Sequence, residues 1–239
     1  MSKKIQAVIL AGGKGTRLRP YTAVIPKPLM PVGDYPICEV IIRQLKAAGL
    51  KNIAISTGHL AGLIEAYFGD GKKWGVNISY VMEHKPLGTA GALKLVKQMD
   101  TDCLVINGDV LTDLNFKELI KYHKTKKAMA TITIKERVVK TDFGVIEVDE
   151  NGDLSDYIEK PEHKSFVSIG VYILNKGCLN FIKEEENIGM PDLVLRMKDA
   201  GKKIGCFKTT ALWLDLGRLD DFEISQEIFE KYKKNFLTK

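Results

Sequence analysis

The segment AGGKGTRLRP at positions 11–20 has the highest density of residues that could bind a charged ligand. Its flexible and charged members are Gly12, Gly13, Lys14, Gly15 and Arg17. Glycine backbone lets amide N–H groups approach a ligand closely, and the adjacent cations indicate that this ligand is an anion. The segment therefore predicts a phosphate-binding loop.

Two common phosphate-binding motifs do not fit this loop. The dinucleotide fingerprint G-x-G-x-x-G is matched by Gly13 and Gly15, but Leu18 occupies its third glycine position. The P-loop needs a spacing of glycines and lysine that the segment lacks. Pro20 also disfavours the long helix that follows the loop in both motifs. The spacing thus argues against a dehydrogenase and a P-loop enzyme.

Lys27 and Asp109 are further candidates for chemistry. Lys27 lies between Pro26 and Pro28, which stiffen the chain and hold the lysine as a pre-aimed point charge. Asp109 follows the buried strand LVIN, at the strand end where ligands gather in open α/β sheets. A solvated lysine and a helix N-cap aspartate are the alternative interpretations.

Strands and helices that alternate along the first half would position these residues. We expect strands over 5–11, 51–58, 76–82 and 102–109, and helices over 35–50, 60–71 and 88–99. This order predicts a Rossmann-like, doubly wound α/β fold with a mainly parallel sheet flanked by helices.

The pattern changes after residue 127. Closely spaced strands are expected over 128–137, 143–160 and 165–175, with a hairpin turn at ENGD, so the sheet gains antiparallel strands in its second half. We expect one domain over 1–239, with two halves that meet at about residue 127. The sequence shows no short repeats of the kind that form a C-terminal β-helix.

Composition narrows the class of partner. The net charge of +6 comes without aromatic interleaving or a recognition motif, so small anions are favoured over nucleic acid. No apolar run approaches the roughly 18 residues of a membrane span, and we expect no membrane partner. The four cysteines are scattered without a CxxC pair, which indicates reduced thiols and a cytoplasmic protein.

Several motifs in the right order resemble those of the sugar-1-phosphate nucleotidyltransferases, in particular the mannose-1-phosphate guanylyltransferases. They are LAGGKGTRLRPYT, PKPLMPVGDYPI, EHKPLGTAGAL, INGDVL, DFGVIEVDENG, YIEKP and WLDLG. The resemblance implies Mg²⁺-dependent transfer of a nucleotidyl group from a nucleoside triphosphate to a sugar 1-phosphate, with release of pyrophosphate. It also implies that residues of about 1–127 form a nucleotide-binding half, that residues of about 128–239 form a sugar-binding half, and that the chain could form a homo-oligomer.

The resemblance assigns roles to residues of this sequence. The catalytic residues are expected to be Arg17, Lys27 and Asp109. The nucleotide is expected to contact Leu10, Ala11, Gly12, Gly13, Lys14, Gly15, Thr16, Arg17, Glu83, Gly88 and Thr89. The sugar phosphate is expected to contact Lys27, Gly144, Glu159, Lys160 and Ser168. Asp109 and Asp215 are expected to hold the metal ion.

Substrate identity stays open at this level. The step PLGTAG favours GTP, with a mannose-type hexose or a heptose 1-phosphate as its partner. The alternatives are UTP, dTTP or CTP with glucose 1-phosphate or an amino sugar 1-phosphate. A non-catalytic sensor of nucleotide sugars is an alternative from a different class, and an exposed Glu159–Lys160 pair is the alternative for that motif.

Overall fold

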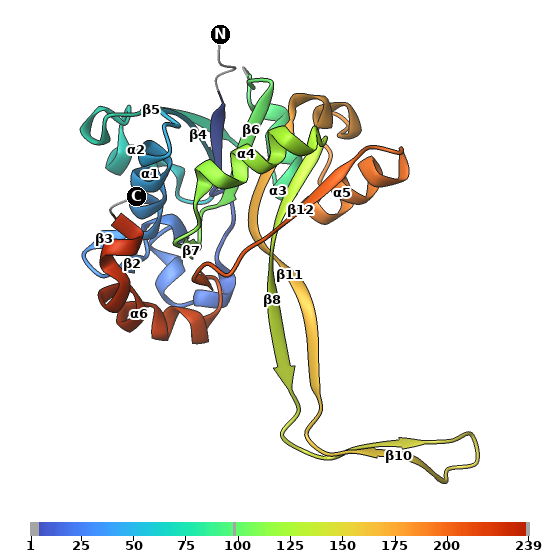
Figure 1. The fold of residues 1–239 in the computed structure, drawn as a ribbon. Coiled ribbons are helices and arrows are strands. Elements are labelled where there is room, and N and C mark those ends of the chain that lie inside the picture. Colours follow the sequence, from blue (N-terminus) through green and yellow to red (C-terminus); the bar gives the residue numbers. More distant parts are fainter. Residues whose placement is uncertain (1–4, 98, 238–239) are drawn as a thin grey trace.

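The computed structural model describes residues 5–97 and 99–237, which build on a seven-stranded sheet (Figure 1). The strand order is β12-β8-β11-β6-β1-β4-β5. The bounds are β1 (Gln6–Leu10), β4 (Asn52–Thr57), β5 (Asn77–Met82), β6 (Asp102–Asn107), β8 (Ala130–Lys140), β11 (Glu162–Asn175) and β12 (Ile204–Lys208).

The mixed, mainly parallel sheet predicted from the sequence is confirmed. Strands β6, β1, β4 and β5 are parallel neighbours, whereas β11 runs antiparallel to both β6 and β8. Leu10 at the end of β1 lies in register with Asn107 at the end of β6. The segments that follow these two strands, residues 11–17 and 108–109, therefore begin side by side at one edge of the sheet.

Helices cover both faces of the sheet. They are α1 (Ile37–Ala47), α2 (Ala61–Phe68), α3 (Gly88–Gly91), α4 (Phe116–Lys126), α5 (Met190–Asp199) and α6 (Leu219–Leu237). Alternate residues of β1 point to opposite faces, so that Ile9 packs with α1, α2, α4 and α6 while Val8 packs with α3 and α5. Each fully buried Ile or Leu in these two layers contributes about 1.5–3 kcal/mol.

The helix predicted over 88–99 is much shorter in the structure. Four residues form α3, and Ala92–Leu95 continue as a 3₁₀ helix. The backbone N–H groups of Ala90 and Gly91 donate to the carbonyl of Ile188, at 3.0 and 3.3 Å. Tertiary hydrogen bonds to the segment before α5 thus replace part of the local helical bonding, which periodicity alone could not indicate.

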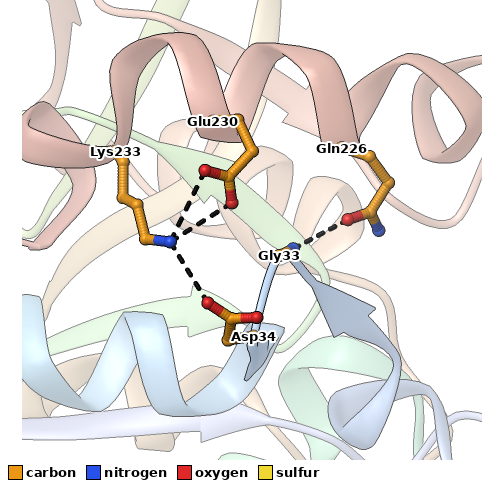
Figure 2. Close-up of polar contacts among 5 residues, drawn as sticks. All are labelled: Gly33, Asp34, Gln226, Glu230 and Lys233. Atoms are coloured by element: carbon orange, nitrogen blue, oxygen red, sulfur yellow. Dashed lines mark hydrogen bonds and ion pairs between the residues drawn. The ribbon is translucent and has the colours of Figure 1, made fainter.

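The C-terminal helix is fastened to an amino-terminal hairpin (Figure 2). The hairpin consists of β2 (Pro31–Val32) and β3 (Tyr35–Pro36). The N–H of Gly33 donates to Gln226 Oε1 at 2.7 Å, and Lys233 pairs with Asp34 and Glu230, each at 3.2 Å. Because α6 begins two residues after Gly217, this contact holds the WLDLG segment against the first part of the chain.

Strands β8 and β11 continue beyond the sheet as a projecting hairpin, here called the arm (residues 134–168) (Figure 1). Its far end carries β9 (Val145–Val148) paired antiparallel with β10 (Leu154–Ile158). The predicted ENGD turn is present, since the N–H of Gly152 donates to the carbonyl of Asp149 at 3.1 Å. The antiparallel strands are confirmed, but most of their length lies outside the body.

None of the described helices combines the length and the apolar content needed to cross a bilayer.

His123 on α4 is expected to make stability depend on pH. Its Nδ1 lies 2.8 Å from Thr131 Oγ1, and burial lowers the pKa of His123 below 6.5, although nearby Asp102 opposes this shift. As the pH falls below about 6.5, His123 therefore binds a proton in the unfolded chain before it does so in the folded chain. The free energy of unfolding decreases over this range, until the pH reaches the lower pKa of the folded state.

Urea titrations between pH 7.5 and 5 would measure this effect. We expect the wild-type midpoint to fall across this range, and the slope to be smaller in His123→Asn. His163→Asn, which changes an exposed histidine of the arm, serves as the control and should keep the wild-type slope. An equal slope in all three proteins would contradict the assignment to His123.

Candidate active site

A pocket of about 450 Å³ opens where β1 and β6 end. The predicted nucleotide-side residues that line it are Leu10, Ala11, Gly12, Gly13, Gly15, Thr16, Arg17, Glu83, Gly88 and Thr89. Lys27 and Asp109 line it as well, whereas Lys14 is exposed on the same loop outside the lining. With Gly217, which also lines the cavity, segments from five regions of the sequence meet there.

The glycine loop is fixed at its second half and open at its first half. Gly15 has φ +61°, a left-handed conformation that suits glycine, and its carbonyl accepts a hydrogen bond from Thr22 Oγ1 at 2.7 Å. Thr16–Leu18 then form a 3₁₀ turn in which Leu18 is buried. This anchor leaves Arg17 exposed beside the pocket, while Gly12 and Gly13 present their backbone to it.

Lys27 and Asp109 form an ion pair inside the pocket, and their side chains are only 15% and 17% exposed. Lys27 begins a 3₁₀ turn, in which the N–H of Met30 donates to the Lys27 carbonyl at 3.0 Å and Pro28 is buried. The sequence predicted that the prolines hold Lys27 in place, and the structure has this lysine in a regular 3₁₀ turn that contains Pro28. An ammonium held in this way is a preorganised charge.

Asp215 lies next to Asp109 because of a small second sheet. Strand β7 (Val110–Thr112) pairs antiparallel with β13 (Trp213–Asp215), which sets Asp215 opposite Val110. The N–H of Leu216 donates to the carbonyl of Asp109 at 2.9 Å. Two aspartates that are far apart in the sequence are therefore neighbours at the pocket edge.

Gly217 is the meeting point of these charges. A Cβ at this position would lie 2.9 Å from both Arg17 Nη2 and Asp215 Oδ1, and in contact with Lys27 Nζ. The N–H of Gly217 also donates to Asp215 Oδ1 at 2.9 Å. Only glycine leaves room here for two cations and a carboxylate to converge.

Glu83 also lines the pocket. Its carboxylate accepts hydrogen bonds from Ser56 Oγ and, at 3.3 Å, from the N–H of Leu87. It lies against Gly12, whose absent side chain makes room for it. The carboxylate is thus held in place by two donors and by its packing against Gly12.

Gly88 and Thr89 approach the pocket through their backbone. Gly88 has φ +73°, and a Cβ there would lie 2.5 Å from the carbonyl oxygen of Ile188. The hydroxyl of Thr89 accepts a hydrogen bond from the N–H of Met190 at 2.8 Å. The Thr89 side chain therefore fastens α5, and its main chain remains available to a ligand.

The four predicted sugar-side residues of the second half lie apart from the pocket lining. Gly144, Glu159 and Lys160 are on the arm, where the last two are exposed. Ser168 is at the base of the arm and donates to the hydroxyl of Tyr172 at 2.9 Å. Within this chain, the structure brings together the residues predicted for the nucleotide side and both aspartates, but not these four residues.

Sequence reasoning missed several residues that line the pocket. They are Pro28, Pro86, Asn107, Gly108 and Gly217. All of them fall inside motifs already singled out, PKP, EHKPLGTAG, INGD and WLDLG. Gly58 was also missed, and a Cβ there would lie 2.8 Å from the Gly12 carbonyl oxygen. The strand-end glycine in STG was the available signal.

Known proteins with similar sequences are sugar-phosphate nucleotidyltransferases. A uridylyltransferase for UTP and glucose 1-phosphate from Synechocystis is 34% identical over 240 residues, covering 91% of this chain and 61% of the relative. A D-glycero-α-D-manno-heptose 1-phosphate guanylyltransferase from Aneurinibacillus thermoaerophilus is 30% identical over 231 residues, covering 95% of this chain and 100% of the relative. This chain therefore spans about three fifths of the first relative and all of the second.

The fold is also shared with solved structures. A putative glucose-1-phosphate thymidylyltransferase from Bacillus anthracis, crystallised with a sucrose, superimposes with a TM-score of 0.76 at 25% identity, and the match covers 94% of both chains. The sequence profile of the family described as nucleotidyl transferase matches residues 6–232. This match spans nearly the whole sequence, and the chain therefore belongs to the nucleotidyl transferase family.

Proposed function

We propose that this protein transfers a nucleotidyl group from a nucleoside triphosphate to a sugar 1-phosphate. The observation that carries the proposal is the convergence of Arg17, Lys27, Asp109 and Asp215 around Gly217, beside a glycine loop. Two anionic substrates repel each other, and positive charge at fixed positions offsets that repulsion. Catalysis of phosphoryl transfer consists largely of such positioning and charge neutralisation.

The residues divide the work by their chemistry. The planar guanidinium of Arg17 suits the β- and γ-phosphates, and backbone N–H groups of Gly12 and Gly13 suit the same chain of oxygens. Lys27 suits the α-phosphate or the incoming phosphate. A sugar phosphate oxygen then bonds to the α-phosphorus, whose bond to the bridging oxygen breaks, and pyrophosphate leaves with the electron pair. No covalent enzyme intermediate is needed.

The carboxylates fit a Mg²⁺ ion. Mg²⁺ prefers oxygen ligands and is commonly held by one or two carboxylates together with substrate phosphates. Asp109 and Asp215 supply such a pair, and no larger cluster of His, Cys, Asp or Glu suited to a metal occurs among the described residues. When bound, the ion would neutralise phosphate charge and orient the oxygens.

Glu83 favours GTP among the triphosphates. An ionised carboxylate only accepts hydrogen bonds, and the Watson–Crick edge of guanine offers two adjacent donors, N1–H and N2–H₂. Uracil and thymine offer one donor on that edge, N3–H, and the carbonyl oxygens on either side of it would repel the second carboxylate oxygen. The proposed partner is a mannose-type hexose or a heptose 1-phosphate, and UTP with glucose 1-phosphate is the second candidate because the Synechocystis relative carries that name.

A pyrophosphate-release assay over a panel of triphosphates and sugar 1-phosphates tests this proposal. We expect the highest kcat/KM with GTP and a mannose-type or heptose 1-phosphate. Glu83→Gln should lower kcat/KM for GTP by about 5- to 150-fold, since a good paired base contact contributes roughly 1–3 kcal/mol. Binding of a nucleotide sugar without pyrophosphate release from any pair would indicate a sensor. Higher activity with UTP would refute the choice of base.

A further inference from the structure

The arm exposes far more apolar surface than a water-facing hairpin tolerates. Phe143 is 78% exposed, Leu154 66% and Val148 65%, and Ile146 and Tyr157 are also exposed. A two-stranded hairpin is at best marginally stable in water, and apolar surface of this extent marks an interaction site. We therefore expect another protein surface to cover these apolar side chains of the arm.

The charge of the arm points to the body of this same protein. Residues 141–159 contain seven Asp or Glu and no Lys or Arg, which gives this segment a formal charge of −7. The whole arm, residues 134–168, has nine Asp or Glu and five Lys or Arg, a formal charge of −4, so the rest of the +6 chain carries +10. Opposite potentials on two surfaces favour their encounter and their correct docking.

The body also exposes apolar side chains, where the amino-terminal loop meets α6. Val24 is 70% exposed, Tyr21 53% and Leu219 48%, and the Tyr21 ring lies 6.3 Å from that of Phe222, which joins the amino-terminal loop to α6. Arg17 and Arg19, both exposed, precede Tyr21 by four and two residues. An acidic, apolar arm end is complementary to both features.

The arm points away from the body that carries its own pocket. β8 and β11 pair without a break from Ile134 to Lys140, and the shift in their register lies at the base of the arm, between Ser168 and Tyr172. At the rise of about 3.3 Å per residue of an extended strand, this seven-residue ladder alone is about 20 Å long. Figure 1 shows the arm leaving the body and its far end turning farther away. Folding back would require a sharp bend at the base of the arm or a break in this ladder.

We propose that two copies of this chain exchange arms, and that each arm brings Glu159 and Lys160 to the sugar side of the other copy's pocket. This inference rests on the proposed function, because that function requires a sugar-phosphate subsite. It explains why the pocket of a single chain has its nucleotide side and both aspartates while these residues lie outside. When two copies exchange identical arms, the same contact between arm and body forms twice, and such exchange is a low-cost route to a dimer.

A mixed dimer of two inactive variants tests the exchange. Asp109→Asn impairs the body and keeps the arm, whereas the double variant Glu159→Ala, Lys160→Ala impairs the arm and keeps the body. Co-expression with two different tags, followed by purification through both, yields the mixed dimer. One of its two sites then combines an intact body with an intact arm, so we expect about half of the wild-type activity. Activity no higher than that of the parent variants would overturn the exchange.

Sedimentation measures the same exchange without the reaction. We expect wild type to sediment as a dimer of the 26.7 kDa chain, and the double variant Phe143→Asp, Leu154→Asp to sediment as a monomer. Leu195→Asp changes an exposed leucine on α5 and should leave the dimer intact. A monomeric but active wild type would refute the arm exchange alone. A dimeric wild type inactive with every substrate pair would refute the proposed function alone.

Discussion

Replacing Lys27 by alanine is expected to lower kcat/KM by about 30- to 1,000-fold, which corresponds to roughly 2–4 kcal/mol of transition-state stabilisation. The ammonium of Lys27 is largely buried, pairs with Asp109 and lies against Gly217. It is thus held where negative charge would gather, and water cannot supply an equivalent charge at that place. Initial rates of pyrophosphate release at varied triphosphate concentration would measure the loss.

Lys72→Ala is the matched control for this substitution. Lys72 pairs with Asp70 on the surface, and its side chain is 85% exposed. Exposed pairs of this kind contribute little, so its activity should equal that of wild type. Thermal unfolding of both variants, measured in parallel, separates a catalytic loss from a loss of folded protein. A change in kcat/KM below about threefold in Lys27→Ala would remove this lysine from the proposed chemistry.

Asp109→Asn is expected to reduce kcat by about 100- to 1,000-fold while the protein remains folded. Asparagine keeps the shape of the side chain and one acceptor oxygen, but it loses the charge that would hold Mg²⁺ and that pairs with Lys27. The Mg²⁺ concentration that gives half-maximal activity should therefore rise. A titration of rate against Mg²⁺ tests both expectations.

Asp199→Asn, at the end of α5 and exposed, provides the control for loss of one negative charge. It should leave both kcat and the Mg²⁺ requirement at the wild-type values. Near-normal turnover of Asp109→Asn at ordinary Mg²⁺ would show that Asp109 does not hold the metal ion.

The sequence by itself determined the parts of this protein that depend on local patterns. The buried run before the glycine loop predicts β1, and the spacing of Ile37, Val40 and Leu45 predicts α1, because strand and helix periods are set by backbone geometry. The glycines and cations of residues 12–17 predict a site for anions from residue chemistry alone. The order of the motifs identified the family without any structure.

Only the tertiary structure decided which distant residues meet. The pairing of β7 with β13 sets Asp215 beside Asp109, and the bonds from Ile188 shorten the helix expected over 88–99. The tertiary structure also directs β8 and β11 out of the body, so that Glu159 and Lys160 lie on an arm rather than at the pocket. Such outcomes depend on strand register and on long-range packing, which no window of sequence contains.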